Sequence, residues 1–446
     1  MKKLIKYAML LSVFVLGLFL VACTGDDPVQ DSTGDPSVEE PGSVEEPGSE
    51  GDSLEPVTIS IAWWGGENRH NRTIEAIELF MDEFPHITVE YDFAGWDDYW
   101  TLLNTQAAGN NLPDIIQMDV TRVNEFAENN LIISLNDLIN SGHIDLSDVL
   151  PIYQEVLQID GENMSISLGA NGFAMVYNTE MAAELGFEFT SELTWDEFRD
   201  FLTETRAAKG DDFYGWGFGA EYEVFNVFAR DAGGLIYGHD GGLGFDESVL
   251  VDFFEILSYF NDNRIAVTPE REDAVVEGGE LLHNGVIISE MFASNQIIGT
   301  QEAVEPELGL ALLPRIAGGQ NGNWVRASMG FSITTHSQEQ EAAALFIDFF
   351  TNNLEVNEIL EAERGAPIAG AVRAHLHPRV DPVVAKTFDF LDLLEANSSP
   401  ADPIPPAGQT EVRSVFLRIS EQLRHNQLTP EQAAEQFMSE ALNILD

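Results

Sequence analysis

Several residue patterns in this chain of 446 residues could do chemistry, and the first question is whether any of them forms a catalytic centre. The sequence holds no Gly-x-Ser-x-Gly turn, no glycine-rich phosphate loop and no His-Glu-x-x-His pattern. Its one close histidine pair, His375 and His377, would point to different faces of a helix and is therefore a poor metal site. With 76 acidic residues, pairs of carboxylates are unavoidable by number alone, so a hydrolase that uses two carboxylates stays open as an alternative.

Aromatic and polar side chains follow two of the predicted strands. Trp63 and Trp64 end an alternating run and precede two glycines, so one indole should leave the sheet while alternation makes the other core. Both could also be core tryptophans. Asp119 follows a buried run directly and Arg122 lies one turn on, although a helix cap with a surface ion pair would use the same residues. Because open α/β sheets bind ligands at the carboxyl ends of their parallel strands, these residues indicate a binding edge.

The elements that must position these residues alternate between strands and helices. Period-two patterns predict strands at 57–62 and 87–91, and an apolar run at 114–118 is typical of a buried parallel strand. Helical spacing covers 72–84 and 100–108. A strand, helix, strand, helix, strand order predicts a doubly wound α/β unit.

The alternation of strands and helices returns after residue 170. Strands are predicted at 173–177, 308–312 and 331–334, and helices at 194–205, 250–261, 338–351 and 430–445. The helix at 194 starts with a Thr-Trp-Asp-Glu capping box. We therefore expect two doubly wound α/β lobes joined by crossing strands, with a C-terminal third that is mostly helical.

Composition sets further bounds. The chain has 21 Lys and Arg against 76 Asp and Glu, a formal charge of −55, and 44% apolar residues. This apolar content is that of a packed protein, and the acidic balance argues against binding nucleic acid. One cysteine excludes a disulfide framework and a cysteine-cluster metal site. We interpret the acidic surface as an adaptation to a saline or alkaline exterior, because salt screens its self-repulsion.

The N-terminus has the pattern of an export signal. Three lysines within the first six residues precede an uncharged run at 7–22, which is shorter than the roughly 20 residues a spanning helix needs. The run ends in Leu-Val-Ala-Cys23, which resembles the lipobox of bacterial lipoproteins. That resemblance implies cleavage before Cys23 and a lipid on its sulfur. The alternative is an incidental cysteine at the end of a membrane anchor.

Residues 24–56 have the composition of a tether. They contain 11 acidic residues, no Lys or Arg, and a near-repeat of Ser-Val-Glu-Glu-Pro-Gly at 37–42 and 43–48. Such a segment cannot build a core, so we expect it to be disordered and to span roughly 30 Å. Removal of residues 1–22, which hold three lysines and no acid, leaves 424 residues with a charge of −58. No broad surface should then attract anionic lipids, and membrane attachment should depend on the lipid alone.

Seven stretches, spread over nearly the whole chain after residue 22, carry recurring motifs: Ile59–Gly66, Phe80–Val89, Ala107–Ile116, Val176–Glu180, Leu193–Phe198, Arg364–Pro367 and Leu428–Ala434. In this order they resemble the extracellular solute-binding proteins of bacterial ABC sugar importers, the family that includes maltose-binding protein. The resemblance implies two lobes that close on a sugar at a hinge and then dock on the transmembrane subunits of a permease. We expect no cofactor and assign no metal ligand, and the sequence leaves calcium binding open.

The resemblance also selects ligand-binding candidates, because aromatic rings cover the C–H faces of a sugar while polar groups take its hydroxyls. Family position favours Trp64 over Trp63. In the second lobe Tyr222 is the best stacking candidate, although it could be core, and the Phe292 loop departs from the family by lacking a tryptophan. Asn171 could instead be a turn residue, and Arg364 could make an ordinary interlobe ion pair. The full set is Trp64, Glu67, Asp119, Arg122, Asn171, Tyr222, Phe292, Trp324 and Arg364.

The expected organisation is a signal at 1–22, a lipidated cysteine and tether at 23–56, lobe 1 at 57–170 and 328–355, lobe 2 at 171–327, and a helical segment at 356–446 mostly in lobe 2. The expected protein is a monomer, anchored at Cys23 on the outer face of the cell membrane, that captures a mono- or oligosaccharide without turnover. The alternatives are a secreted polysaccharide hydrolase and a surface-anchored sensor or adhesin.

Overall fold

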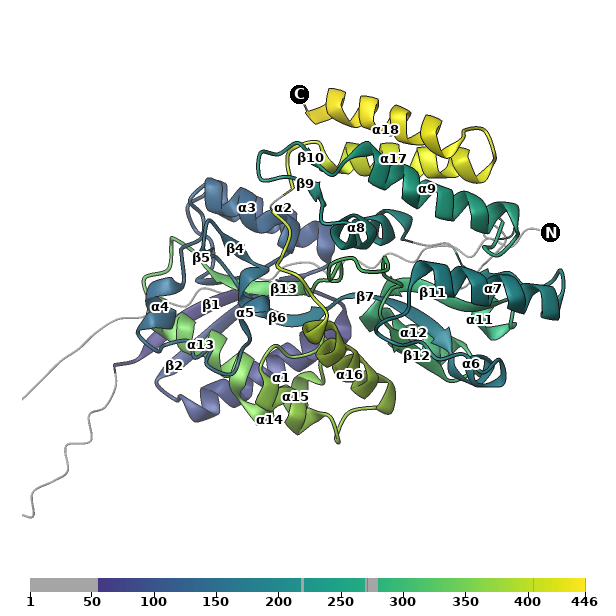
Figure 1. The fold of residues 1–446 in the computed structure, drawn as a ribbon. Coiled ribbons are helices and arrows are strands. Elements are labelled where there is room, and N and C mark those ends of the chain that lie inside the picture. Colours follow the sequence, from purple (N-terminus) through teal and green to yellow (C-terminus); the bar gives the residue numbers. More distant parts are fainter. Residues whose placement is uncertain (1–54, 218–219, 269–270, 272–279, 404, 446) are drawn as a thin grey trace, which may run out of the picture. The chain divides into compact units, whose positions relative to one another are not determined.

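The computed structural model describes residues 55–217, 220–268, 271, 280–403 and 405–445. The expected signal, Cys23 and nearly all of the expected tether lie outside these residues. The described chain contains two mixed β-sheets with helices packed on them, labelled in Figure 1. None of its helices combines the length and the apolarity that crossing a membrane would require.

The first sheet has five strands in the order β2-β1-β3-β13-β6. Strand β1 runs parallel to β2 and β3, while β13 runs antiparallel to β3 and β6. All four residues of β3 are buried, as the apolar run predicts for a parallel strand inside a sheet. The bounds are Val57–Trp64 for β1, Ile87–Ala94 for β2, Ile115–Met118 for β3, Ile166–Asn171 for β6 and Arg326–Ile333 for β13.

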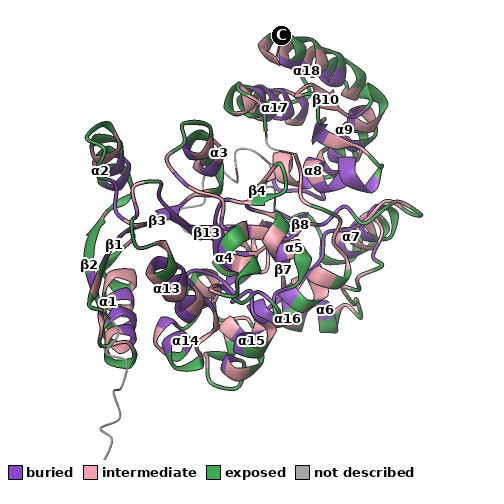
Figure 2. Cartoon of the chain, turned by 90° about the vertical axis from the view of Figure 1, so that its left-hand side faces the viewer, coloured by how far each residue is buried: buried purple, intermediate pink, exposed green. Residues whose placement is uncertain are grey.

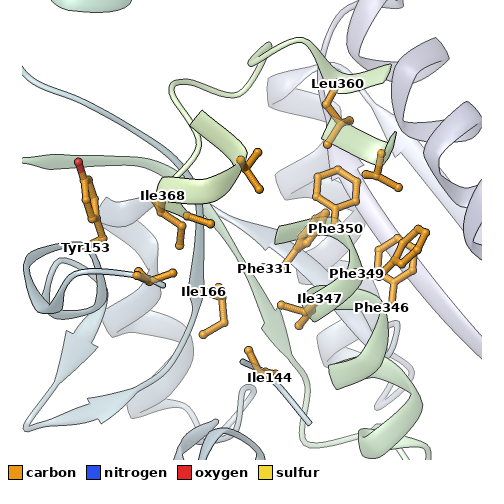
Figure 3. Close-up of a cluster of buried hydrophobic side chains, with 14 of the residues drawn as sticks. Ile144, Tyr153, Ile166, Phe331, Phe346, Ile347, Phe349, Phe350, Leu360 and Ile368 are labelled. Atoms are coloured by element: carbon orange, nitrogen blue, oxygen red, sulfur yellow. The ribbon is translucent and has the colours of Figure 1, made fainter. Parts of the chain in front are cut away.

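A hydrophobic core cluster, which we call core 1, packs on one face of the first sheet. Figure 3 shows part of it, where the ring of Phe331 in β13 packs against those of Phe346 and Phe350. The helices that belong to this half are α1 (Glu67–Glu83), α2 (Trp96–Ala108), α3 (Val120–Glu128), α4 (Asn136–Asn140), α5 (Pro151–Glu155), α13 (Gln340–Asn352), α14 (Leu354–Leu360), α15 (Gly370–Leu376) and α16 (Pro382–Ala396), with a short hairpin of β4 (Gln158–Ile159) and β5 (Glu162–Asn163).

The second sheet has four strands in the order β12-β7-β11-β8. Strand β7 runs antiparallel to both β11 and β12, and β8 runs parallel to β11. The bounds are Phe173–Asn178 for β7, Gly215–Trp216 for β8, Ile287–Ala293 for β11 and Leu308–Ala311 for β12. A separate hairpin pairs β9 (Leu235–Tyr237) with β10 (Leu243–Gly244).

A second hydrophobic cluster, core 2, lies between this sheet and helices that are far apart in the sequence. The last two helices, α17 and α18, pack on α9, as Figure 1 shows. The predicted capping box at Thr194 and Glu197 is formed and starts α7. The helices of this half are α6 (Thr179–Glu184), α7 (Trp195–Lys209), α8 (Glu221–Asp231), α9 (Glu247–Asp262), α11 (Glu280–His283), α12 (Ile297–Ala303), α17 (Gln409–Arg424) and α18 (Pro430–Leu445), with a 3-10 turn at Ser294–Gln296.

In the described part of the chain, three stretches pass from one sheet and its helices to the other: Gly172 between β6 and β7, residues 312–325 between β12 and β13, and residues 397–403 with 405–408 between α16 and α17. A Cβ at Gly172 would lie 2.3 Å from Leu394 Cδ2, so any side chain there would require Leu394 to move. Figure 2 shows buried positions in β3 and β13 at the middle of the first sheet, whereas β2 at its edge is mostly exposed. The crossings therefore connect two separately packed halves.

The C-terminal helical segment divides between the two cores. Side chains from α14, α15 and α16 belong to core 1, whereas those from α17 and α18 belong to core 2. The sequence analysis expected 356–446 to lie mostly in the second lobe. Helical periodicity alone could not make this distinction, because an apolar stripe does not specify which sheet it will cover.

Candidate ligand-binding site

The end of β1 carries the two neighbouring tryptophans on opposite faces. Trp63 is fully buried in core 1, and its indole nitrogen donates to His70 Nδ1 at 3.1 Å. Trp64 points to the other face and is 7% exposed. Its ring lies 5.1 Å from that of Trp96, 5.4 Å from Tyr99 and 5.6 Å from Trp100. Trp64 is thus part of an aromatic cluster at the sheet edge, in which Trp96 is the exposed member.

A chain of hydrogen bonds holds the backbone at Trp64. Its carbonyl oxygen accepts from Arg69 Nη1 at 3.1 Å and from Gln117 Nε2 at 3.2 Å. Behind it, Arg364 Nε donates to Gln117 Oε1 at 3.0 Å, and Arg364 Nη2 donates to Thr73 Oγ1 at 2.8 Å. Arg364 is 4% exposed, and burial lowers its pKa to about 9. Its partners all belong to the first half, so Arg364 supports the Trp64 loop from behind.

Asp119 and Arg122 lie at the start of α3, directly after β3. Asp119 caps the helix by accepting from Thr121 N at 3.0 Å. The Arg122 guanidinium lies 4.5 Å from the centre of the Trp100 ring and 3.6 Å from Glu125. The interpretation as a cap with a surface ion pair is therefore realised in the structure. Glu67 is the exposed first residue of α1.

The candidates in the second half are scattered. Tyr222 is half-buried, donates to the Tyr237 hydroxyl at 3.2 Å and packs edge-on against Phe416; burial raises the pKa of its hydroxyl. Phe292 is half-buried on β11 and packs against a small cluster around Val176 and Ile287. Neither residue lines the cavity described next.

A cavity of about 250 Å³ lies where the crossings meet the first half. The indole of Trp324 lines it, and is the only one of the sequence-predicted candidates that does. Arg326 and Asn124 add polar groups, and two acidic residues, Glu155 and Asp402, complete its charged lining. The remaining walls are Val120, Thr121, Val123, Val156, Leu157, Gln158, Ile159, Val325, Ala327, Ala401, Pro403 and Pro405.

Buried charges hold the second-half wall of this cavity. The Arg230 guanidinium lies 5.1 Å from the Trp324 ring, forms an ion pair with Asp402 and donates to Gly322 O at 3.0 Å. The neighbouring Asp231 accepts from Gly322 N at 2.7 Å and Ile316 N at 3.1 Å. Burial raises the pKa of the Asp231 carboxyl to about 6. Together, Arg230 and Asp231 fix the two crossing segments that carry Trp324 and Asp402.

The sequence analysis missed Arg326, Asn124, Glu155 and Asp402 as site residues. One signal was available for Arg326: it stands two residues after Trp324, a spacing that places both side chains on the same side of an extended segment. Asn171 of β6 is the strand partner of Arg326 in β13, so its backbone lies beside Arg326 where the chain leaves the first sheet. Among the described residues, no group of three or more His, Cys, Asp and Glu side chains could hold a metal ion.

Two α/β halves, linked by three crossings with a polar and aromatic cavity beside them, define a two-lobed binding protein. The family model for bacterial extracellular solute-binding proteins matches residues 70–353. Because this span exceeds half of the chain, the chain belongs to that family, as the seven sequence stretches predicted.

Solved structures agree on the two-lobed fold. A family 1 extracellular solute-binding protein from Alicyclobacillus acidocaldarius is 26% identical, with a TM-score of 0.80 over 88% of this chain and 100% of that one. An oligogalacturonide-binding protein from Yersinia enterocolitica is 20% identical, with a TM-score of 0.76 over 87% and 98%. The GacH receptor of Streptomyces glaucescens, solved unliganded and with acarbose, is 17% identical, with a TM-score of 0.63 over 87% and 98%.

Proposed function

We propose that this solute-binding protein captures an uncharged mono- or oligosaccharide and delivers it to the transmembrane subunits of an ABC importer. The observation that carries the proposal is the cavity, where an indole stands beside a guanidinium and an amide. An indole packs against the C–H face of a sugar ring, while the polar groups bind its hydroxyls. The oligogalacturonide-binding and acarbose-binding relatives support a carbohydrate ligand.

The charges around the cavity favour a neutral ligand. Glu155 and Asp402 line it, and Asp119 and Glu223 lie close enough to Arg326 to influence its pKa. An acidic sugar would meet Glu155 and Asp402 at close range, and like charges in a partly buried site repel strongly. A neutral sugar can use Glu155 as a hydroxyl acceptor, while Asp402 stays paired with Arg230.

Capture follows from the two-lobed architecture. The sugar first binds to one half, and closure adds contacts from the other, so the population shifts to the form that the permease recognises. No covalent step is part of this cycle. The monomer, anchored outside the cell through a lipid on Cys23, then remains beside its permease.

A screen of neutral trisaccharides, such as maltotriose, cellotriose and xylotriose, against trigalacturonate tests the proposal. A ligand at 100 times its Kd stabilises the folded state by about 2.7 kcal/mol, which raises Tm measurably. Tryptophan fluorescence should change in the same titrations, because Trp324 lines the cavity. A sensor or adhesin without closure would leave the fluorescence unchanged. Shortened sugars in the sample would support the hydrolase alternative, and stronger binding of trigalacturonate would refute a neutral ligand.

The lipid anchor has its own experiment. The full chain and its Cys23→Ala variant are produced in a bacterial host that is fed labelled palmitate. We expect label and detergent-phase partitioning for the wild type and neither for the variant. Equal membrane association of both proteins would refute attachment through Cys23.

A further inference from the structure

Arg326 stands at the junction of the two halves. It is the first residue of β13 and pairs with Asn171, the last residue of β6. Its guanidinium lies 4.6 Å from the centre of the Phe173 ring, and its side chain lines the cavity together with Trp324. The Phe173 ring in turn lies 6.0 Å from that of Trp324. Arg326 therefore packs on the Phe173 ring, while its side chain lines the cavity beside Trp324.

The guanidinium of Arg326 differs from its counterparts in having no direct polar partner. Among the described arginines that are not exposed, it alone makes neither a hydrogen bond nor an ion pair with a described residue. By contrast, Arg230 contacts Asp402 and Gly322, and Arg364 contacts Gln117 and Thr73. The donors of this half-buried guanidinium therefore have no described protein partner, so they are free to bind water or a ligand that enters the cavity.

Two carboxylates, one from each half, stabilise the positive charge of Arg326 without accepting hydrogen bonds from its guanidinium. Asp119 comes from the first half and Glu223 from the second, and both oppose the lowering of the Arg326 pKa by burial. Asp119 is used as the cap of α3, and Glu223 accepts from Arg413 at 3.0 Å. The charge of Arg326 is thus tolerated while its five N–H donors remain available.

We propose that Arg326 is a specificity-determining residue that donates hydrogen bonds to adjacent oxygens of the bound sugar. This inference rests on the proposed function and adds a residue to its site. The planar fork of a guanidinium fits two neighbouring oxygens at once, which a single ammonium or amide donor does not. With the Trp324 indole two residues earlier, one short segment offers both a ring for the sugar face and donors for its hydroxyls.

The test compares Arg326→Gln with wild type, using the neutral trisaccharide that binds best in the screen. Arg418→Gln is the matched control, because it removes an arginine paired with Glu440 on the outer helices α17 and α18. Tm without sugar and Kd are measured for all three proteins. We expect Arg326→Gln to melt no lower than wild type without sugar, and its Kd to rise about tenfold or more. Arg326→Lys keeps the positive charge but loses the paired donors of the guanidinium, so its Kd should lie between those of wild type and Arg326→Gln.

Each result separates the possibilities. A Tm lowered by several degrees in unliganded Arg326→Gln would show that the arginine supports the fold, and would overturn the proposal. Unchanged sugar affinity in that variant would overturn it too, while leaving the sugar-binding function intact. If the wild type bound no sugar in the panel, the proposed function itself would fail, and the role of Arg326 with it.

Discussion

Two arginine environments in this protein show how differently one residue type can be used. Behind the Trp64 loop, Arg364 is 4% exposed and donates to Gln117 and Thr73. At the cavity, Arg326 is half-buried, lies over Phe173 and makes no such bond with a described residue. The first environment keeps a loop in place, while the second keeps donors available. Hydrogen bonds from the guanidinium to the rest of the chain, rather than burial alone, distinguish an arginine that supports the fold from one whose donors can bind a ligand.

The largest effect should come from the same substitution made in both environments. Arg364→Lys keeps a buried charge but cannot reach Gln117 and Thr73 together, so we expect the free energy of unfolding to fall by about 3 kcal/mol. Arg326→Lys loses no hydrogen bond to a described residue and should change it by less than about 0.5 kcal/mol. Denaturant unfolding without sugar measures both. Equal losses in the two variants would remove the distinction between the environments.

The tryptophans near the two arginines should respond differently to truncation. Trp324→Ala is expected to weaken sugar binding by about 2 kcal/mol, since a packed aromatic ring at a recognition site contributes about that much. Trp64 is 7% exposed and does not line the cavity, so Trp64→Ala should instead lower the free energy of unfolding by about 3 kcal/mol or more. Calorimetric titration gives the affinities and denaturant unfolding the stabilities, with Trp195→Phe in core 2 as the binding control. If Trp324→Ala bound sugar normally, its assignment to the site would be wrong.

Asp231 extends the comparison to a buried acid. Its carboxyl accepts two backbone hydrogen bonds, and yet burial disfavours its ionised form. Its pKa is about 6 in the fold against an ordinary 3.8, so the folded state holds this proton between those values. This group therefore stabilises the fold more as pH falls, and that contribution is lost as pH rises through 6. Wild type should gain roughly 2 kcal/mol relative to Asp231→Asn between pH 7 and pH 4.5. Chemical denaturation at both pH values measures the difference, and parallel pH profiles would contradict it.

The smallest effect should come from the exposed pair of Arg418 and Glu440. Their nitrogen–oxygen distance is 2.5 Å, but both side chains are more than one-third exposed. Arg418→Gln should change the free energy of unfolding by less than about 0.5 kcal/mol, because solvent and salt screen such pairs. A loss comparable to that of Arg364→Lys would mean that contact alone, without burial, governs how arginines contribute to this fold.

The sequence predicted local structure well wherever a pattern repeated. The alternation through Trp63 and Trp64 did place one indole in core 1 and the other on the opposite face, and the Thr194 capping box did start α7. It also favoured the family that residues 70–353 match. The start of one helix was missed: α1 begins at Glu67, earlier than the predicted 72. It follows a glycine, which carries no side-chain signal of a cap.

The candidate site was harder to predict, because it depends on contacts between distant segments. The sequence analysis listed Arg364 as a ligand residue and missed Arg326, and the partners that hold Arg364 in the fold lie up to 291 residues away. Asp402 lines the cavity because its segment, residues 397–403, passes beside Trp324 on its way between the halves. No local pattern specifies such a crossing. The ligand-binding roles of the other candidates stay predictions.

By itself, the sequence determined the alternation of strands and helices, the acidic surface and the family. Each of these depends only on composition or on which residue types recur at short spacing. Only the tertiary structure decided which arginine is bonded, which helices cover which core and which side chains share a cavity. These outcomes depend on close packing among segments far apart in the chain, where a difference of a few ångströms decides whether a donor finds a partner.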